Sequence, residues 1–248
     1  MRFMERTIMG LRYHRKMNIL IAALTAVYSI IGLFLRTNAA NTTSNATNFS
    51  QRIAELPGSN TSGVTSAVLR AHSTQADYYN IAFAAATLIY LILLIVIAAI
   101  FVRRQQAETA AYIGAGKQPF DIASQTALEG GISATVGFTI VSVIVSLFSA
   151  TVSHWWAKAN QFIFAHAIGQ PRGTQHQEML QGIKTMMSKR MTDFNPQSLL
   201  FGDSGMSSQI PNTVVGFATV GVAAISAVVI VNLIVMMAQA RTVRSHLN

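Results

Sequence analysis

Four long segments of the sequence contain no Asp, Glu, Lys or Arg and consist mainly of apolar residues. A helix needs about 20 such residues to cross the roughly 30 Å hydrocarbon layer of a bilayer. Strands of a membrane barrel would alternate apolar and polar residues, and these segments do not. The sequence therefore predicts an all-α polytopic membrane protein with transmembrane helices over 18–35, 79–102, 131–152 and 214–238.

The composition agrees with a membrane protein and excludes several functional classes. Charged residues are 11% of the 248 residues, whereas a soluble domain carries about 25%. The absence of cysteine excludes disulfides, zinc–thiolate sites, iron–sulfur clusters and cysteine nucleophiles. The net charge is +9, but no basic run is interleaved with aromatic residues, so we expect no nucleic-acid partner.

The distribution of cations predicts the orientation of the chain. More than half of the 18 Lys and Arg residues lie in the short segments 1–17, 103–130 and 239–248. Cytoplasmic loops carry an excess of Lys and Arg. We therefore expect both termini and the middle segment to be cytoplasmic, the segments 36–78 and 153–213 to face outward, and the first span to be retained rather than cleaved as a signal peptide.

The segments that flank the spans have their own patterns. In residues 1–17, Met4, Ile8 and Leu11 share one helical face away from the Arg residues, which predicts an interfacial amphipathic helix; a basic flank that only sets topology is the alternative. Segment 36–78 begins as an Asn- and Thr-rich polar loop, and its residues 64–78 can form a short helix that runs into the second span. The outer loop 153–213 is expected to contain a helix over 174–191, whose Met stripe packs on its own protein or binds a partner.

Motifs for catalysis or cofactor binding are incomplete. Around Gly116-Lys117 the sequence resembles a phosphate-binding loop, but Ala111 replaces its first glycine and Gln118 its hydroxyl residue. The histidines show no metal-ligand spacing. We expect no catalytic residues, no bound metal and no cofactor, so the chain is not expected to be an enzyme.

Hydroxyl residues line one face of the third predicted span, at steps of four and three residues. Small and polar residues let membrane helices approach closely and hydrogen-bond. Two interpretations are open: a polar path for a substrate, or a seam for helix packing or dimerisation, which we favour. The seam residues are Ser133, Thr135, Gly137, Thr139, Ser142, Ser146, Ser149 and, in the fourth span, Asn232.

The segment after the second span carries a family resemblance. It contains the basic pair Arg103-Arg104, then Glu108, an apolar stretch, Gly116 and Ile122, with Glu129 seven residues further on at the start of a Gly-rich span. This pattern, together with the order of spans, resembles the FtsX/MacB-type ABC transporter permeases. The chain departs from the family pattern at Ile113, where a basic residue is usual, and in its short first outer region.

The resemblance implies a non-catalytic permease subunit in a bacterial cell membrane. It implies pairing with a second copy, contact with membrane lipid, and docking to a cytoplasmic ABC ATPase subunit that binds ATP and Mg. Residues 104–118 would form the coupling helix that contacts the ATPase. The residues implied in coupling are Arg104, Gln105, Glu108, Tyr112 and Gly116.

The mechanism implied by the resemblance is mechanical. ATP hydrolysis in the partner would move the outer loops, acting on a peptide, a lipid-linked molecule or a protein at the outer face. The alternative function is a non-transporting tetraspan protein that serves as a structural or accessory subunit of a membrane complex. An accompanying ATPase would distinguish these two functions.

Overall fold

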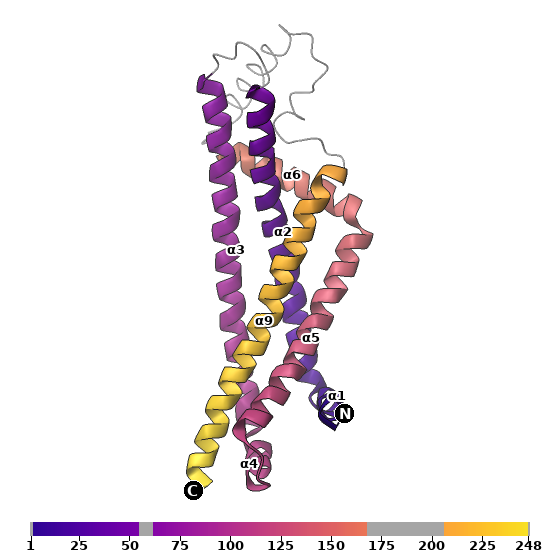
Figure 1. Cartoon of the computed structure of the whole chain (residues 1–248), viewed down its shortest axis with the longest axis vertical. Coiled ribbons are helices and arrows are strands. Elements are labelled where there is room, and N and C mark those ends of the chain that lie inside the picture. The colour runs from indigo at the N-terminus through magenta and orange to yellow at the C-terminus, as the bar shows by residue number, and fades with distance from the viewer. Residues whose placement is uncertain (1, 55–61, 168–205, 248) are drawn as a thin grey trace. The chain divides into compact units, whose positions relative to one another are not determined.

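In the computed structural model, the described part of the chain is almost entirely helical (Figure 1). The structure describes residues 2–54, 62–167 and 206–247. Its helices are α1 (Arg2–Tyr13), α2 (Arg15–Ala54), α3 (Ser62–Arg104), α4 (Gln106–Gly114), α5 (Pro119–Leu147), α6 (Ser149–Ala167) and α9 (Met206–Leu247). The predicted helix over 174–191 lies outside the described residues.

Four of these helices contain stretches that are long and apolar enough to cross a membrane. The stretches are Arg15–Gln51, Val68–Arg104, Pro119–Leu147 and Asn212–Ser245, and each overlaps one uncharged segment of the sequence. Large apolar side chains such as Ile89, Leu93 and Ile140 are exposed on these helices, as suits helices surrounded by lipid tails. The prediction of a helical multi-pass protein with four membrane-spanning helices is thus confirmed at the level of length and composition.

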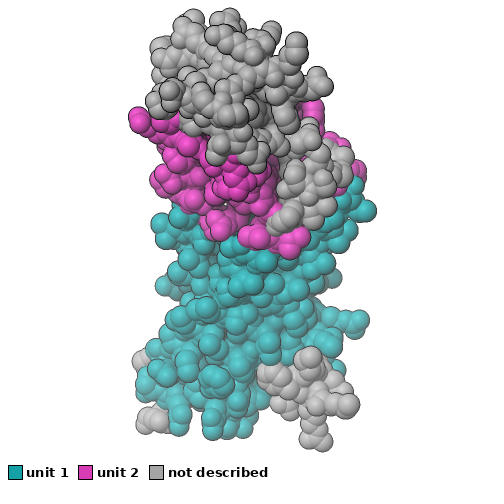
Figure 2. All heavy atoms as spheres, turned by 45° about the horizontal axis from the view of Figure 1, so that its top comes forward, with its two compact units in different colours: residues 1–32, 84–147, 218–248 teal, residues 33–83, 148–217 magenta. Residues whose placement is uncertain are grey.

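The chain divides into two compact units, which Figure 2 colours separately. Unit 1 comprises residues 1–32, 84–147 and 218–248, and unit 2 comprises residues 33–83 and 148–217. Helices α2, α3 and α9 each contribute to both units.

Glycines allow close helix contacts within unit 1. A Cβ atom on Gly137 of α5 would collide with the backbone carbonyl of Ala22 in α2. A Cβ atom on Gly221 of α9 would lie 2.8 Å from the ring of Phe138 in α5. Small residues have this role in membrane helices, where dispersion contacts rather than exclusion of water hold helices together.

Hydroxyl groups join α2 to α3 in unit 1. The rings of Tyr28 and Tyr90 stack with their centroids 4.2 Å apart. The hydroxyls of Thr25 and Tyr90 are 2.9 Å apart, and those of Tyr28 and Thr87 are 3.0 Å apart. Because lipid offers no hydrogen-bond partner, these bonds satisfy polar groups that would otherwise be left without one.

Unit 2 contains helix where the sequence predicts a polar loop. From the sequence, residues 36–78 form an outer loop with a short helix over 64–78, but α2 continues to Ala54. Helix α3 begins at Ser62, which agrees with the short helix expected before the second span. No Gly or Pro interrupts the chain from Leu33 to Leu56, so α2 has no local reason to end. The polar face is also buried, since Asn38 and Thr42 are at most 2% exposed.

Amide side chains pack in the interior of unit 2. Gln75 of α3 donates from Nε2 to the carbonyl oxygen of Asn160 in α6 at 3.0 Å and also to its side-chain oxygen. The Tyr79 hydroxyl donates to the same Asn160 side-chain oxygen at 2.9 Å. We call Gln75, Tyr79 and Asn160 the amide network; all three side chains are buried.

Helix α5 begins earlier than the predicted third span. The sequence assigns 103–130 to a cytoplasmic coupling helix and linker and 131–152 to the span, whereas one helix runs from Pro119 to Leu147 and α6 begins at Ser149. Pro119 occupies the first position of α5, which proline favours because its missing N–H is not needed there. Glu129 consequently lies inside a helix of spanning length and is only 5% exposed.

Candidate functional site

Helix α4 is a short element with well-defined ends between α3 and α5. Gly116 has a φ of 85°, a conformation that glycine adopts at little cost. Its N–H donates to the carbonyl of Ile113 at 2.9 Å, and the N–H of Lys117 donates to the carbonyl of Tyr112 at 3.1 Å. These two bonds form a Schellman motif, and Pro119 starts the next helix three residues later.

One side of α4 is bonded to the bend between α1 and α2. The Gln105 side-chain nitrogen lies 2.7 Å from Nε2 of His14. Tyr112 donates its hydroxyl hydrogen to Oε1 of Glu108 at 3.3 Å. Oε2 of Glu108 lies 4.0 Å from Nε2 of His14. We call His14, Gln105, Glu108 and Tyr112 the His14 cluster; it connects α4 to the N-terminal segment.

The environment favours uncharged forms of two members of the His14 cluster. Burial lowers the pKa of His14 below its ordinary value, and the Glu108 carboxylate opposes this effect in part. A neutral imidazole leaves one ring nitrogen able to accept the hydrogen bond from Gln105. Burial, followed by the negative charge of Glu108, raises the pKa of Tyr112, so its hydroxyl remains a donor.

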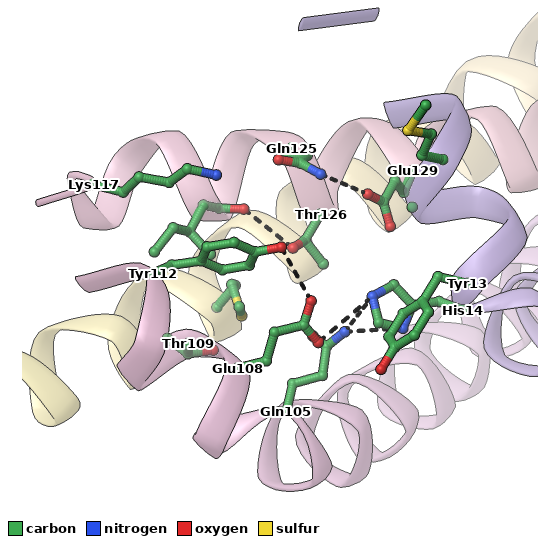
Figure 3. Close-up of a pocket in the computed structure, with 14 residues that line it drawn as sticks. Tyr13, His14, Gln105, Glu108, Thr109, Tyr112, Lys117, Gln125, Thr126 and Glu129 are labelled. Carbon is green, nitrogen blue, oxygen red and sulfur yellow. Dashed lines mark hydrogen bonds and ion pairs between the residues drawn. The ribbon is translucent and has the colours of Figure 1, made fainter. Parts of the chain in front are cut away.

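The His14 cluster lines a pocket of about 590 Å³ in unit 1 (Figure 3). Glu129 of α5 projects into this pocket and accepts a hydrogen bond from Nε2 of Gln125 at 3.2 Å. Gly10 of α1 packs so closely on this carboxylate that a Cβ atom there would collide with it. At the opposite wall, Nζ of Lys117 lies 4.0 Å from the centre of the Tyr112 ring. Helices α1, α4 and α5 thus surround two carboxylates.

A small apolar core lies beside the pocket. It consists of Val102 of α3, Ile122 and Ala123 of α5, and Met236 of α9, and Tyr112 and Ile113 of α4 pack against it. In addition, Nε2 of Gln239 in α9 donates to the carbonyl of Val102 at 2.7 Å. Helix α4 therefore contacts α3, α5 and α9 through this core.

The residues implied in coupling do not share one exposed face. Gln105, Glu108 and Tyr112 line the pocket, while Arg104 is exposed and Gly116 forms the turn after α4. The face of α4 that is open to solvent consists instead of Gln106, Ala107 and Ala111. Helical spacing indicated which residues share a face but not which face packs inward.

The predicted seam residues fall into two groups. Ser133, Gly137 and Asn232 are buried inside unit 1, and a Cβ atom on Gly130 would collide with the Asn232 side chain. The second group is mostly exposed, with Ser142 half-buried: Thr135, Thr139, Ser142, Ser146 and Ser149. The stripe ends near the junction of α5 and α6, since α5 stops at Leu147.

The pocket residues that the sequence-predicted site lacks include three that take part in its polar contacts: His14, Gln125 and Glu129. Glu129 had a signal, because it completes the family-like pattern seven residues after Ile122. No sequence pattern pointed to His14 or Gln125, because only folding brings His14 to α4 and Gln125 to the pocket that contains Glu129.

The chemistry that the described side chains offer in the pocket is hydrogen bonding and charge. Within residues 2–54, 62–167 and 206–247, no group of three or more His, Asp or Glu side chains is arranged to hold a metal ion. The polar contacts of the pocket join His14 to Gln105 and to Glu108 of α4, and they otherwise lie within α4 and within α5. In comparisons with known proteins, no family model, curated protein or solved structure matches this chain.

Proposed function

We propose that this chain is the membrane-spanning, non-catalytic subunit of an ABC transporter, and that α4 receives the movement of a separate ATPase. The observation that carries this proposal is the construction of α4. It is a discrete helix with a Schellman motif at its end, and the His14 cluster bonds it to the bend between α1 and α2. A coupling element needs this combination of an outer contact surface and firm internal attachments.

The contacts of α4 provide a route for mechanical coupling. A displacement of α4 would reach α3, α5 and α9 through the core around Ile122 and Met236. It would reach the start of α2 through Gln105 and His14. Coupling between distant sites travels through packed side chains and hydrogen bonds of this kind. Movement of the spanning helices would then act on the segments at the outer face.

The ATPase would contact the solvent-exposed face of α4. This face contains Gln106, Ala107 and Ala111, and its small side chains permit close approach by a partner. Gln105, Glu108 and Tyr112 have a different role in this proposal, because they transmit the displacement inward from α4. ATP and Mg would be bound by the partner, and a second copy of the chain would complete the complex in a bacterial cell membrane.

The test is copurification of the tagged chain from its native host, followed by mass spectrometry. A stoichiometric ATP-binding subunit is expected with the wild type and with Thr242→Arg, a control that adds the same charge at an exposed position of α9. Ala107→Arg and Ala111→Arg should abolish its recovery by blocking the contact surface. Recovery of other membrane subunits without any ATPase would overturn the proposal and favour the structural tetraspan alternative.

A further inference from the structure

A second hollow in unit 1 lies between the beginning of α2 and the end of α3. Its volume is about 550 Å³. It shares Tyr13, His14, Gln105 and Glu108 with the first pocket but continues along the two spanning helices instead of toward α5. We call it the α2–α3 groove. The stacked rings of Tyr28 and Tyr90 confirm that these two helices pack side by side.

Three cations line one end of the α2–α3 groove. Arg15 and Lys16 come from the first turn of α2, and Arg104 is the last residue of α3. All three are exposed, and no described carboxylate lies within ion-pair distance of any of them. Glu108 also lines the groove, but its carboxylate accepts the Tyr112 hydroxyl. The charge of the three cations is therefore available to a ligand.

The wall beyond the cations is apolar on both helices. Leu20 lies one turn after Lys16 in α2, and Ile100 and Ile97 lie one and two turns before Arg104 in α3. Residues at these spacings share a helical face. Leu20 is 48% exposed and Ile100 is 51% exposed. Helix α2 enters the spanning region at the end where α3 leaves it. The side chains that line the groove therefore change from cationic to apolar in the same direction along both helices.

From this arrangement we propose that the α2–α3 groove binds an anionic phospholipid. Arg15, Lys16 and Arg104 would bind its phosphate, and an acyl chain would lie along Leu20, Ile97 and Ile100. Basic pockets between membrane helices recognise anionic headgroups in this way. A zwitterionic lipid fits less well because its ammonium group would meet three cations. A soluble phosphate would leave the apolar wall uncovered.

The bound lipid would stabilise the end of unit 1 that carries the His14 cluster. The groove borders the contact between His14 and Gln105, so a lipid there contacts both sides of that hydrogen bond. This inference does not rest on the proposed transporter function, since a structural protein would bind the same lipid. An experiment on the purified chain alone therefore tests it independently of any ATPase.

The experiment is native mass spectrometry of the full chain in a neutral detergent, titrated with phosphatidylglycerol. Phosphatidylcholine with the same acyl chains and glycerol 3-phosphate serve as the competing ligands. The test variant combines Arg15→Gln, Lys16→Gln and Arg104→Gln. The matched control combines Arg103→Gln, Arg241→Gln and Arg244→Gln, which removes the same charge from exposed positions that do not line the groove. Single variants Lys16→Gln and Leu20→Gln cover the case in which the triple variant does not fold.

We expect one phosphatidylglycerol adduct on the wild type and on the control, with at least tenfold preference over phosphatidylcholine. Each cation near an anionic headgroup contributes about fivefold in affinity, so the triple variant should bind on the order of a hundredfold more weakly. Lys16→Gln and Leu20→Gln should each weaken binding severalfold. Equal binding of both lipids, equal weakening in the control, or full competition by glycerol 3-phosphate would overturn the proposal.

Discussion

The amide network of unit 2 and the His14 cluster of unit 1 place polar side chains inside a membrane protein in different ways. In the amide network, Gln75, Tyr79 and Asn160 are all buried, and their partners are uncharged groups. The His14 cluster instead combines an imidazole with a carboxylate and borders a pocket of about 590 Å³. A closed network of neutral groups specifies packing, whereas ionisable groups beside a cavity can respond to a ligand, a partner or pH.

The largest expected effect comes from removing the centre of the amide network. Asn160→Ala would leave the buried Tyr79 hydroxyl without its Asn160 acceptor, at a cost of about 1 to 3 kcal/mol, and would remove one of the two hydrogen bonds that Gln75 donates to residue 160, at a further cost of about 1 kcal/mol. The free energy of unfolding should therefore fall by about 2 to 4 kcal/mol, measured by denaturant titration in detergent. Lys158→Ala, an exposed change in the same helix, should cost less than about 0.5 kcal/mol. Equal effects of the two changes would show that the network does not contribute to stability.

In unit 1, two glycine-to-alanine changes should have opposite effects. Gly137→Ala places a methyl group against the Ala22 backbone, which cannot move aside as a flexible side chain would, and such overpacking costs about 1 to 3 kcal/mol. Gly114→Ala meets no atom within 4 Å of its new Cβ and should stabilise α4 by a few tenths of a kcal/mol, up to about 1 kcal/mol. Thermal unfolding in detergent compares the two variants directly. A fully stable Gly137→Ala protein would mean that α5 does not pack closely on α2 at this position.

Protonation of His14 should distinguish the His14 cluster from the amide network. Because the folded state lowers the pKa of His14, the unfolded chain binds this proton more readily. The contribution of His14 to the unfolding free energy is therefore fully present above a pH of about 6.5, which is the pKa of His14 in the unfolded chain. This contribution is lost as the pH falls through the lower pKa that His14 has in the folded state. Between pH 7.5 and 5, the wild type should lose more stability than His14→Gln. The stability change caused by Asn160→Ala should be the same at both pH values.

The sequence was informative where local chemistry decides the structure. The uncharged segments identified the spans, because a run of about 20 residues without charge is a local property of the chain. It was less informative where packing decides. The helix beyond Leu35 buries Asn38 and Thr42, whose polarity favoured a loop. Glu129 faces a pocket because α1 packs on α5 through Gly10, and this contact has no sequence pattern.

The smallest effect on stability should come from the exposed hydroxyls of α5. Thr135 and Thr139 are exposed, and Thr135 donates only to the Gly131 carbonyl of its own helix at 2.8 Å. Changing both to Leu should alter the unfolding free energy by less than about 0.5 kcal/mol. The proposed function includes a second copy of the chain. If that copy covers this face, the dimer fraction in chemical crosslinking should fall even though stability does not change, because the larger Leu side chains keep the two helices from close approach. Ile140→Leu, a change that conserves side-chain volume at a neighbouring exposed position, should leave the dimer fraction unchanged. If the dimer fraction of the double variant is not reduced, the contact between copies lies on another face. The hydroxyls of α5 would then differ from the amide network in one respect only, which is that they have no buried hydrogen-bonding partner.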